Sequence, residues 1–185
     1  MNNNRKSIRL KNYDYRSNGY YFVTICTHEK ICYFGNIENQ KVNLSKLGKI
    51  AKQFWLEIPD HCDSVEIDSF VVMPNHVHGI IIINKSMTEN VGMFHETSLS
   101  VANNEDDLSK IMSDLSPKKG SLSSIIRSYK SAVTRWSKLN NYDGFKWQSR
   151  FYEHIIRDEH SLNSIREYIV NNPRKWKQDS NYQKE

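Results

Sequence analysis

The chain has 185 residues, of which 38% are hydrophobic and 25% are charged, and it carries a formal net charge of +5 with a pI near 9.0. This length accommodates one domain with its own core, and the positive charge favours a polyanionic partner, with nucleic acid ahead of a membrane surface. No segment reaches the ~18 consecutive apolar residues of a membrane span, and the N-terminal residues lack the apolar segment of a signal peptide. We therefore expect an intracellular, cytoplasmic protein without membrane contact.

The first half of the chain predicts three strands and a helix. Residues 20–28 are rich in aromatic and β-branched side chains and indicate a strand. Residues 44–58 carry apolar side chains at intervals of three and four, which predicts an amphipathic helix that ends before Pro59. Residues 65–74 and 76–83 predict two further strands, and the short connection between them favours an antiparallel hairpin.

The second half begins with a polar segment and then returns to regular structure. Between Asn84 and Gly120 no periodicity is sustained, so residues 85–119 are expected to form a long polar insertion rather than a second domain. Residues 121–140 predict an amphipathic helix with basic side chains. Residues 149–157 predict a strand, and residues 160–171 a final helix closed by Pro173.

The order of these elements predicts the fold class. Strand, helix, strand, strand, helix, strand and a last helix match the split β-α-β arrangement of a ferredoxin-like domain. We expect an α+β fold in which an antiparallel sheet has helices packed on one face, with a C-terminal helix added. The whole chain, residues 1–185, is expected to form a single domain.

Two histidines open the strand at 76–83, in the segment MPNHVHGI. Side chains alternate between the faces of a strand, so His76 and His78 share one face while Val77 lies on the other. Their positions are roughly 6 to 7 Å apart by the strand rise, which allows both rings to bind one cation. A His-x-His pair also occurs at strand starts without a metal. A metal site is therefore indicated only if another part of the chain supplies a further residue for it.

The final helix offers such a partner. Tyr168 and Asn172 are four residues apart and therefore lie on one helical face, beside the expected buried stripe. A phenol near a divalent ion bound by two imidazoles and an amide oxygen is a candidate nucleophile for phosphoryl transfer. Taken separately, Tyr168 could be an aromatic side chain flanking the core, and Asn172 could be the residue that ends the helix before Pro173.

Three segments in this order, MPNHVHGI, WQSRFYEHIIRDE and IREYIVNNPRKW, resemble the single-tyrosine HUH transposase superfamily. The resemblance is to the REP-associated tyrosine transposases, which are related to the IS200/IS605 transposases. In those families HUH means histidine, hydrophobic residue, histidine, and here the triplet is His76, Val77 and His78. The resemblance spans roughly residues 20–176, with the insertion excluded.

The resemblance implies a function and a role for each site residue. His76 and His78 would bind Mg²⁺ or Mn²⁺, and Tyr168 would attack a DNA phosphate, leaving a 5′-phosphotyrosine link and a free 3′-hydroxyl. Asn172 would stand where the insertion-sequence relatives have a glutamine, and would complete the metal shell with a side chain one methylene shorter. The implied activity is that of a transposase and single-strand endonuclease acting on single-stranded or hairpin DNA at the nucleoid. Because the relatives include dimers and monomers, a homodimer stays open.

Other residues compete for these roles. Tyr129 has Val133 four residues later, which cannot bind a metal, and Tyr152 lies in the predicted strand at 149–157. His154 of that strand either approaches the cation behind the direct ligands or is a hydrogen-bonded structural histidine. Candidates for contacts with the DNA backbone, with a solvated surface as the alternative, are Arg127, Lys130, Arg135, Arg174 and Lys175.

Two other functions fit the same residues. A protein that kept the fold but lacked cleavage would be a hairpin-DNA-binding protein or repressor. A metal-dependent hydrolase would use water as its nucleophile, with Tyr168 only positioning the phosphate. The presence of His76, His78 and Tyr168 together favours the transposase over the binding protein, whereas replacing Tyr168 by phenylalanine would separate transposase from hydrolase.

Overall fold

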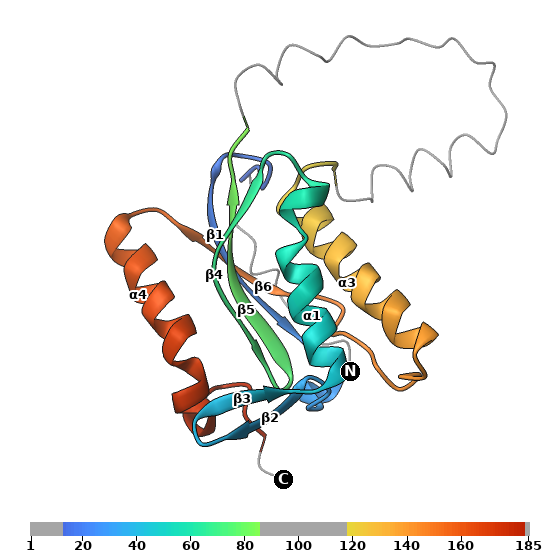
Figure 1. The fold of residues 1–185 in the computed structure, drawn as a ribbon. Helices are drawn as coiled ribbons and strands as arrows, with labels where there is room; N and C mark the ends of the chain where they lie inside the picture. Colours follow the sequence, from blue (N-terminus) through green and yellow to red (C-terminus); the bar gives the residue numbers. More distant parts are fainter. Residues whose placement is uncertain (1–12, 86–117, 184–185) are drawn as a thin grey trace, which may run out of the picture.

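A computed structural model describes residues 13–85 and 118–183 (Figure 1). The expected insertion at 85–119 falls almost entirely outside the described residues, so it stays a prediction, as does the single-domain assignment of the whole chain. Within the two described ranges, no helix is both long and apolar enough to cross a bilayer.

The main sheet has four antiparallel strands: Gly19–Cys26 (β1), Val65–Met73 (β4), His76–Ile83 (β5) and Tyr152–Ile156 (β6). Their order across the sheet is β4-β5-β1-β6. Helix α1 (Lys46–Leu56) precedes β4, and helix α3 (Leu122–Leu139) precedes β6. This is the split β-α-β arrangement of a ferredoxin-like α+β fold, so the predicted fold class is confirmed.

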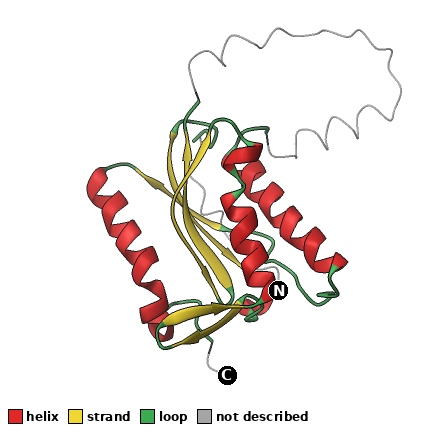
Figure 2. Ribbon diagram, viewed as in Figure 1, coloured by secondary structure: helices red, strands yellow, loops and turns green. Residues whose placement is uncertain are grey.

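Helices lie on both faces of this sheet (Figures 1 and 2). Helices α1 and α3 cover one face, where the main core includes Val77 and Ile81 of β5. Helix α4 (Glu159–Asn171) covers the other face, over a smaller core that includes Phe22 and Ile80. The expected C-terminal helix is therefore present, and it faces the side of β5 that carries the even-numbered residues.

A second, two-stranded sheet is a feature that the sequence analysis does not predict. Its strands are Gly35–Glu38 (β2) and Lys41–Leu44 (β3). Leu44 therefore belongs to a strand rather than to the helix expected over 44–58. Helix α1 begins only at Lys46, because the side chain of Ser45 accepts a hydrogen bond from the amide of Gly48 at 3.0 Å and caps the first turn.

An ion pair fixes α4 to the sheet in addition to the small core. The register of β4 against β5 is irregular between Ile67 and Phe70, and Asp68 lies in this bulge. The guanidinium of Arg166 in α4 donates from Nε to both Asp68 oxygens at 3.1 Å, and from Nη2 to Oδ2. These hydrogen bonds hold the pKa of the Asp68 carboxyl below its ordinary value, against the effect of its partial burial.

Replacement of Gly79 by alanine should destabilise the fold. A Cβ at Gly79 would lie 2.3 Å from Cζ2 of Trp55, a fully buried side chain that packs on β5. Because the tryptophan has no room to move, we expect the free energy of unfolding in urea to fall by about 1–3 kcal/mol. Gly144→Ala is the control, since its new Cβ would meet no atom closer than 3.4 Å. Equal stability of the two variants would contradict the packing argument.

Loss of the ion pair should destabilise the protein in a pH-dependent way. The folded-state pKa of Asp68 is depressed, so its contribution is present above the unfolded pKa of about 3.9 and is lost as the pH falls through the folded value. We therefore expect Asp68→Asn to lower the urea midpoint at pH 7 and to match the wild type more closely near pH 3. Arg166→Gln should act in the same way, and the double variant should lose little more than either single variant. A difference that does not change with pH would contradict this account.

Candidate active site

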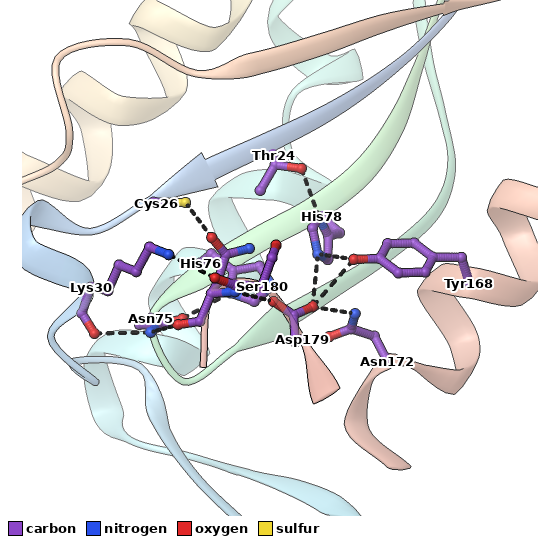
Figure 3. Close-up of polar contacts among 11 residues, drawn as sticks. Thr24, Cys26, Lys30, Asn75, His76, His78, Tyr168, Asn172, Asp179 and Ser180 are labelled. Carbon is purple, nitrogen blue, oxygen red and sulfur yellow. Dashed lines mark hydrogen bonds and ion pairs between the residues drawn. The ribbon is translucent and has the colours of Figure 1, made fainter. Parts of the chain in front are cut away.

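The four residues predicted as a metal and nucleophile site come together between β5 and the C-terminal end of α4 (Figure 3). His76 and His78 point from β5 toward α4, with ring centroids 4.3 Å apart. The hydroxyl of Tyr168 lies 3.1 Å from Nε2 of His78, and Asn172, one turn later, is the C-cap residue of α4. The structure therefore joins side chains that are about 90 residues apart in the sequence.

Asp179 is a fifth member of the cluster, which the sequence analysis misses. It follows the 3-10 segment Asn172–Gln178 (η4), and its side chain is 1% exposed. Its Oδ2 accepts hydrogen bonds from Nδ2 of Asn172 at 2.8 Å and from the Tyr168 hydroxyl at 3.2 Å. The same oxygen lies 3.7 Å from Nε2 of His78.

A weak signal for Asp179 is present in the sequence. It lies 11 residues after Tyr168 and 7 after Asn172, roughly three and two helical turns. Pro173 argues against a continuous helix there, so this spacing predicts nothing without the path of the chain.

The donor atoms of this cluster suit a divalent cation. Ligand atoms of His76, His78 and Asp179 lie within 4.8 Å of one another, and all three residues are buried. Among the described residues, Nε2 of His76 and Oδ1 of Asn172 are buried side-chain acceptors with no hydrogen-bond partner. Since buried polar atoms are rarely left without a partner, two lone pairs directed into a cluster of imidazole and carboxylate groups fit a bound metal ion.

The charges of these groups also suit a metal. Burial lowers the pKa of His76 well below its usual value, with the neighbouring His78 adding to the effect, and burial likewise lowers the pKa of His78. Burial alone would raise the pKa of Asp179, but the nearby His78 ring and the hydrogen bonds from Asn172 and from the amide of Asn181 hold the pKa well below the usual range. At neutral pH the site therefore offers two neutral imidazoles and one carboxylate, which are the forms that bind metals.

Tyr168 is the group of this cluster that reaches solvent, with 44% of its surface exposed. Partial burial, followed by the nearby Asp179 carboxylate, raises the pKa of its phenol to about 12. Without an ion at the site, Tyr168 is thus protonated at neutral pH. A positive charge near the phenol oxygen would oppose the effect of Asp179 and favour the phenolate.

The competing tyrosines lie elsewhere. Tyr129 is buried between α3 and α1, where its hydroxyl donates to the carbonyl of Ala51 at 3.0 Å and burial raises its pKa. It is therefore on the opposite side of the sheet from the histidines. Tyr152 is exposed on the edge strand β6, and its ring meets the edge of Phe22 with centroids 6.2 Å apart. Within the described residues, neither hydroxyl is hydrogen bonded to the cluster.

The other predicted site residues are divided between the two faces. His154 is exposed on β6, opposite Phe22 in the register, and no hydrogen bond joins it to the cluster among the described residues. Arg127 and Arg135 are exposed on α3, and this helix lies across the sheet from α4, which carries Tyr168 (Figure 1). Lys130 is half-buried and donates to the carbonyl of Gln148, and burial lowers its pKa.

Arg174 and Lys175 are the predicted basic residues that lie near the cluster. Both are exposed in η4, directly after Asn172 and before Asp179. Two of the five basic residues predicted to contact the DNA backbone therefore lie in the segment between two members of the cluster. The roles of all five stay predictions.

Comparisons with known proteins bear on the family and on the fold of this chain. No family model matches the chain. An "uncharacterized protein" of Haemophilus influenzae is 44% identical over 184 residues, which cover 96% of this chain and 93% of that protein. The structure of a REP-associated tyrosine transposase bound to a REP hairpin is similar with a TM-score of 0.56 and 19% identity, over 92% of this chain and 74% of that one.

The crystal structure of a proposed transposase of Deinococcus radiodurans matches over 89% of this chain and 97% of that chain, with 14% identity and a TM-score of 0.38. This TM-score is too low to bear on the fold. The comparison with the Haemophilus influenzae protein shows the family, and the comparison with the REP-associated tyrosine transposase shows the fold. The chain therefore belongs to the same family as the Haemophilus influenzae protein, and it has the fold of a single-tyrosine HUH transposase.

Proposed function

We propose that this protein is a metal-dependent transposase that cleaves and rejoins single-stranded or hairpin DNA with Tyr168 as its nucleophile. The observation that carries the proposal is the contact of a half-exposed phenol with a buried cluster of two imidazoles, an amide and a carboxylate. A nucleophile beside metal-binding groups is an arrangement that supports phosphoryl transfer. The likeness in fold to a transposase bound to a REP hairpin supports the same substrate class.

The residues present would divide the work as follows. His76, His78, Asn172 and Asp179 would bind Mg²⁺ or Mn²⁺, which would withdraw charge from the DNA phosphate and orient it. The phenolic oxygen of Tyr168 attacks phosphorus, so that a tyrosine–phosphate bond forms and the bond from phosphorus to the 3′-oxygen breaks. The phenolic proton leaves to solvent, which reaches Tyr168, and the departing 3′-oxygen takes up a proton to become a hydroxyl.

The exposed position of Tyr168 also bears on the substrate. An attacking phenol needs its phosphate aligned with the leaving oxygen, and a flexible single strand or the foot of a hairpin allows this more readily than a regular duplex. Arg174 and Lys175, which are exposed in η4 between Asn172 and Asp179, would contact the backbone of such a strand. A substrate of this kind would place the protein at the nucleoid, and a homodimer stays a prediction.

Tyr168→Phe should abolish the covalent intermediate while DNA binding persists. We expect purified wild-type protein with Mn²⁺ or Mg²⁺ and a labelled single-stranded hairpin oligonucleotide to form an adduct that survives denaturing electrophoresis. The variant lacks the attacking oxygen, so its adduct should disappear completely. Tyr152→Phe is the matched control, because Tyr152 is 43% exposed against 44% for Tyr168 and lies outside the cluster.

Each other outcome points to one alternative. Cleavage that survives in Tyr168→Phe without any adduct in the wild type would favour a hydrolase that uses water. Binding without cleavage across a panel of hairpins would favour a hairpin-binding protein or repressor. An adduct lost only in Tyr129→Phe would place the nucleophile on the other side of the sheet and refute the site.

Asp179→Asn should weaken metal binding. The substitution keeps the size of the side chain but removes the negative charge from the proposed ligand set, so we expect the dissociation constant for Mn²⁺ to rise at least about tenfold. Isothermal titration calorimetry would measure it. Asp14→Asn is the control, since Asp14 pairs with Arg16 in an exposed ion pair away from the cluster. Equal affinities of the Asp179 variant and the wild type would exclude this carboxylate as a ligand.

A further inference from the structure

We infer that Asn75 is a positioning residue of the proposed metal site. Its side chain fixes the proton of His76 on Nδ1, and it also hydrogen bonds to the segment that carries Asp179. Asn75 precedes His76 at the turn between β4 and β5 and is fully buried. The inference deepens the proposed function, since it rests on His76 and Asp179 being metal ligands. Figure 3 shows the side chains involved.

The orientation of the Asn75 amide is determined by its surroundings. Its Nδ2 lies 2.9 Å from the carbonyl oxygen of Lys30 and 2.9 Å from that of Asn181. Both partners are acceptors only, so both positions require the NH₂ group, and a flipped amide would direct oxygen against oxygen. Oδ1 is therefore the atom that faces His76, at 2.8 Å from Nδ1.

The tautomer of His76 follows from that orientation. A bond between Oδ1 and Nδ1 needs a hydrogen on Nδ1, because the amide oxygen can only accept. A neutral imidazole then has a bare lone pair on Nε2, which is the buried atom without a partner. Asn75 thus presents to the cluster the nitrogen that a metal ion would bind, in the way that outer hydrogen bonds orient metal-binding histidines.

The second bond of the Asn75 amide reaches the carboxylate ligand. The amide N–H of Asn181, whose carbonyl Asn75 binds, donates to Oδ1 of Asp179 at 2.6 Å. Lys30, whose carbonyl is the other acceptor, donates from Nζ to the carbonyl of Ser180 at 2.8 Å. One buried side chain therefore connects the turn before β5, the loop at Lys30 and the segment 179–181. Loss of Asn75 should loosen His76 and Asp179 together.

The decisive measurement on the wild type is the ¹⁵N spectrum of its histidine rings without metal near pH 7.5, recorded by two-bond ¹H–¹⁵N correlation. The His76 signals are assigned by their absence in His76→Gln. We expect the proton of His76 on Nδ1. A proton on Nε2 would overturn the inference, and no substitution at Asn75 is needed to obtain that result.

Asn75→Ala tests the consequence for the metal, with Mn²⁺ alone as the probe. We expect its affinity for Mn²⁺ to fall about 10–100-fold and His76 to lose its fixed tautomer. Asn140→Ala is the matched control. It removes the hydrogen bond from the Asn140 side chain to the carbonyl of Trp136, which lies at the end of α3 on the other side of the sheet. A folded Asn75→Ala protein with wild-type tautomer and Mn²⁺ affinity would overturn the inference.

The two proposals can fail separately. Neither the ring spectra nor the Mn²⁺ titration uses DNA, so they test Asn75 whether or not a phosphotyrosine adduct forms. An Nδ1–H His76 and a weakened Asn75→Ala site, combined with no adduct in the wild type, would support the inference and refute the strand-transfer reaction.

Discussion

The position of β5 in the sheet is the constraint on which the rest of the molecule depends. This strand pairs with β1 on one side and with β4 on the other. Its register against β1 is continuous over His76–Ile83, whereas its register against β4 is interrupted by the bulge between Ile67 and Phe70. Alternation then commits Val77 and Ile81 to the main core and His76 and His78 to the face of α4. A slip by one residue would exchange these sets, placing two imidazoles in the apolar core.

The two faces of the sheet differ in the kind of side chains that they bury, and therefore in how they contribute to stability. The main core is built from large apolar and aromatic side chains, and among the described residues Nε1 of Trp55 is its buried side-chain polar atom without a hydrogen-bond partner. On the other face, two neutral histidines and a carboxylate are buried together, and two acceptor atoms have no partner among the described residues. Each unpaired buried acceptor costs about 1–3 kcal/mol, so this cluster lowers stability unless something binds there. A ligand that binds the folded state alone would recover that free energy.

The sequence predicts those parts of the site in which the residues lie a few positions apart in one strand or helix. His76 and His78 follow from a period of two, and the pair Tyr168 and Asn172 follows from a helical turn; the structure brings the two pairs together. Asp179 could not be predicted, because its place depends on the path of the chain after Pro173. It depends also on the hydrogen bonds that the next two residues, Ser180 and Asn181, accept from Lys30 and Asn75 in distant segments. The β2–β3 hairpin was missed because two four-residue strands show too little alternation to be distinguished from a loop.

The same division applies to the basic residues and to the proposed nucleophile. Helical spacing identifies which side chains share a face of α3, but it does not say which face of the sheet the helix covers. Arg127 and Arg135 are exposed on α3, on the other side of the sheet from α4, whereas Arg174 and Lys175 are exposed in η4, between Asn172 and Asp179. A nucleic acid that touched both sets would have to pass around an edge of the sheet. In the proposed reaction Tyr168 would attack one exposed phosphate. Contacts near it would position the reacting strand, whereas a contact behind the sheet would add affinity without orienting the phosphate.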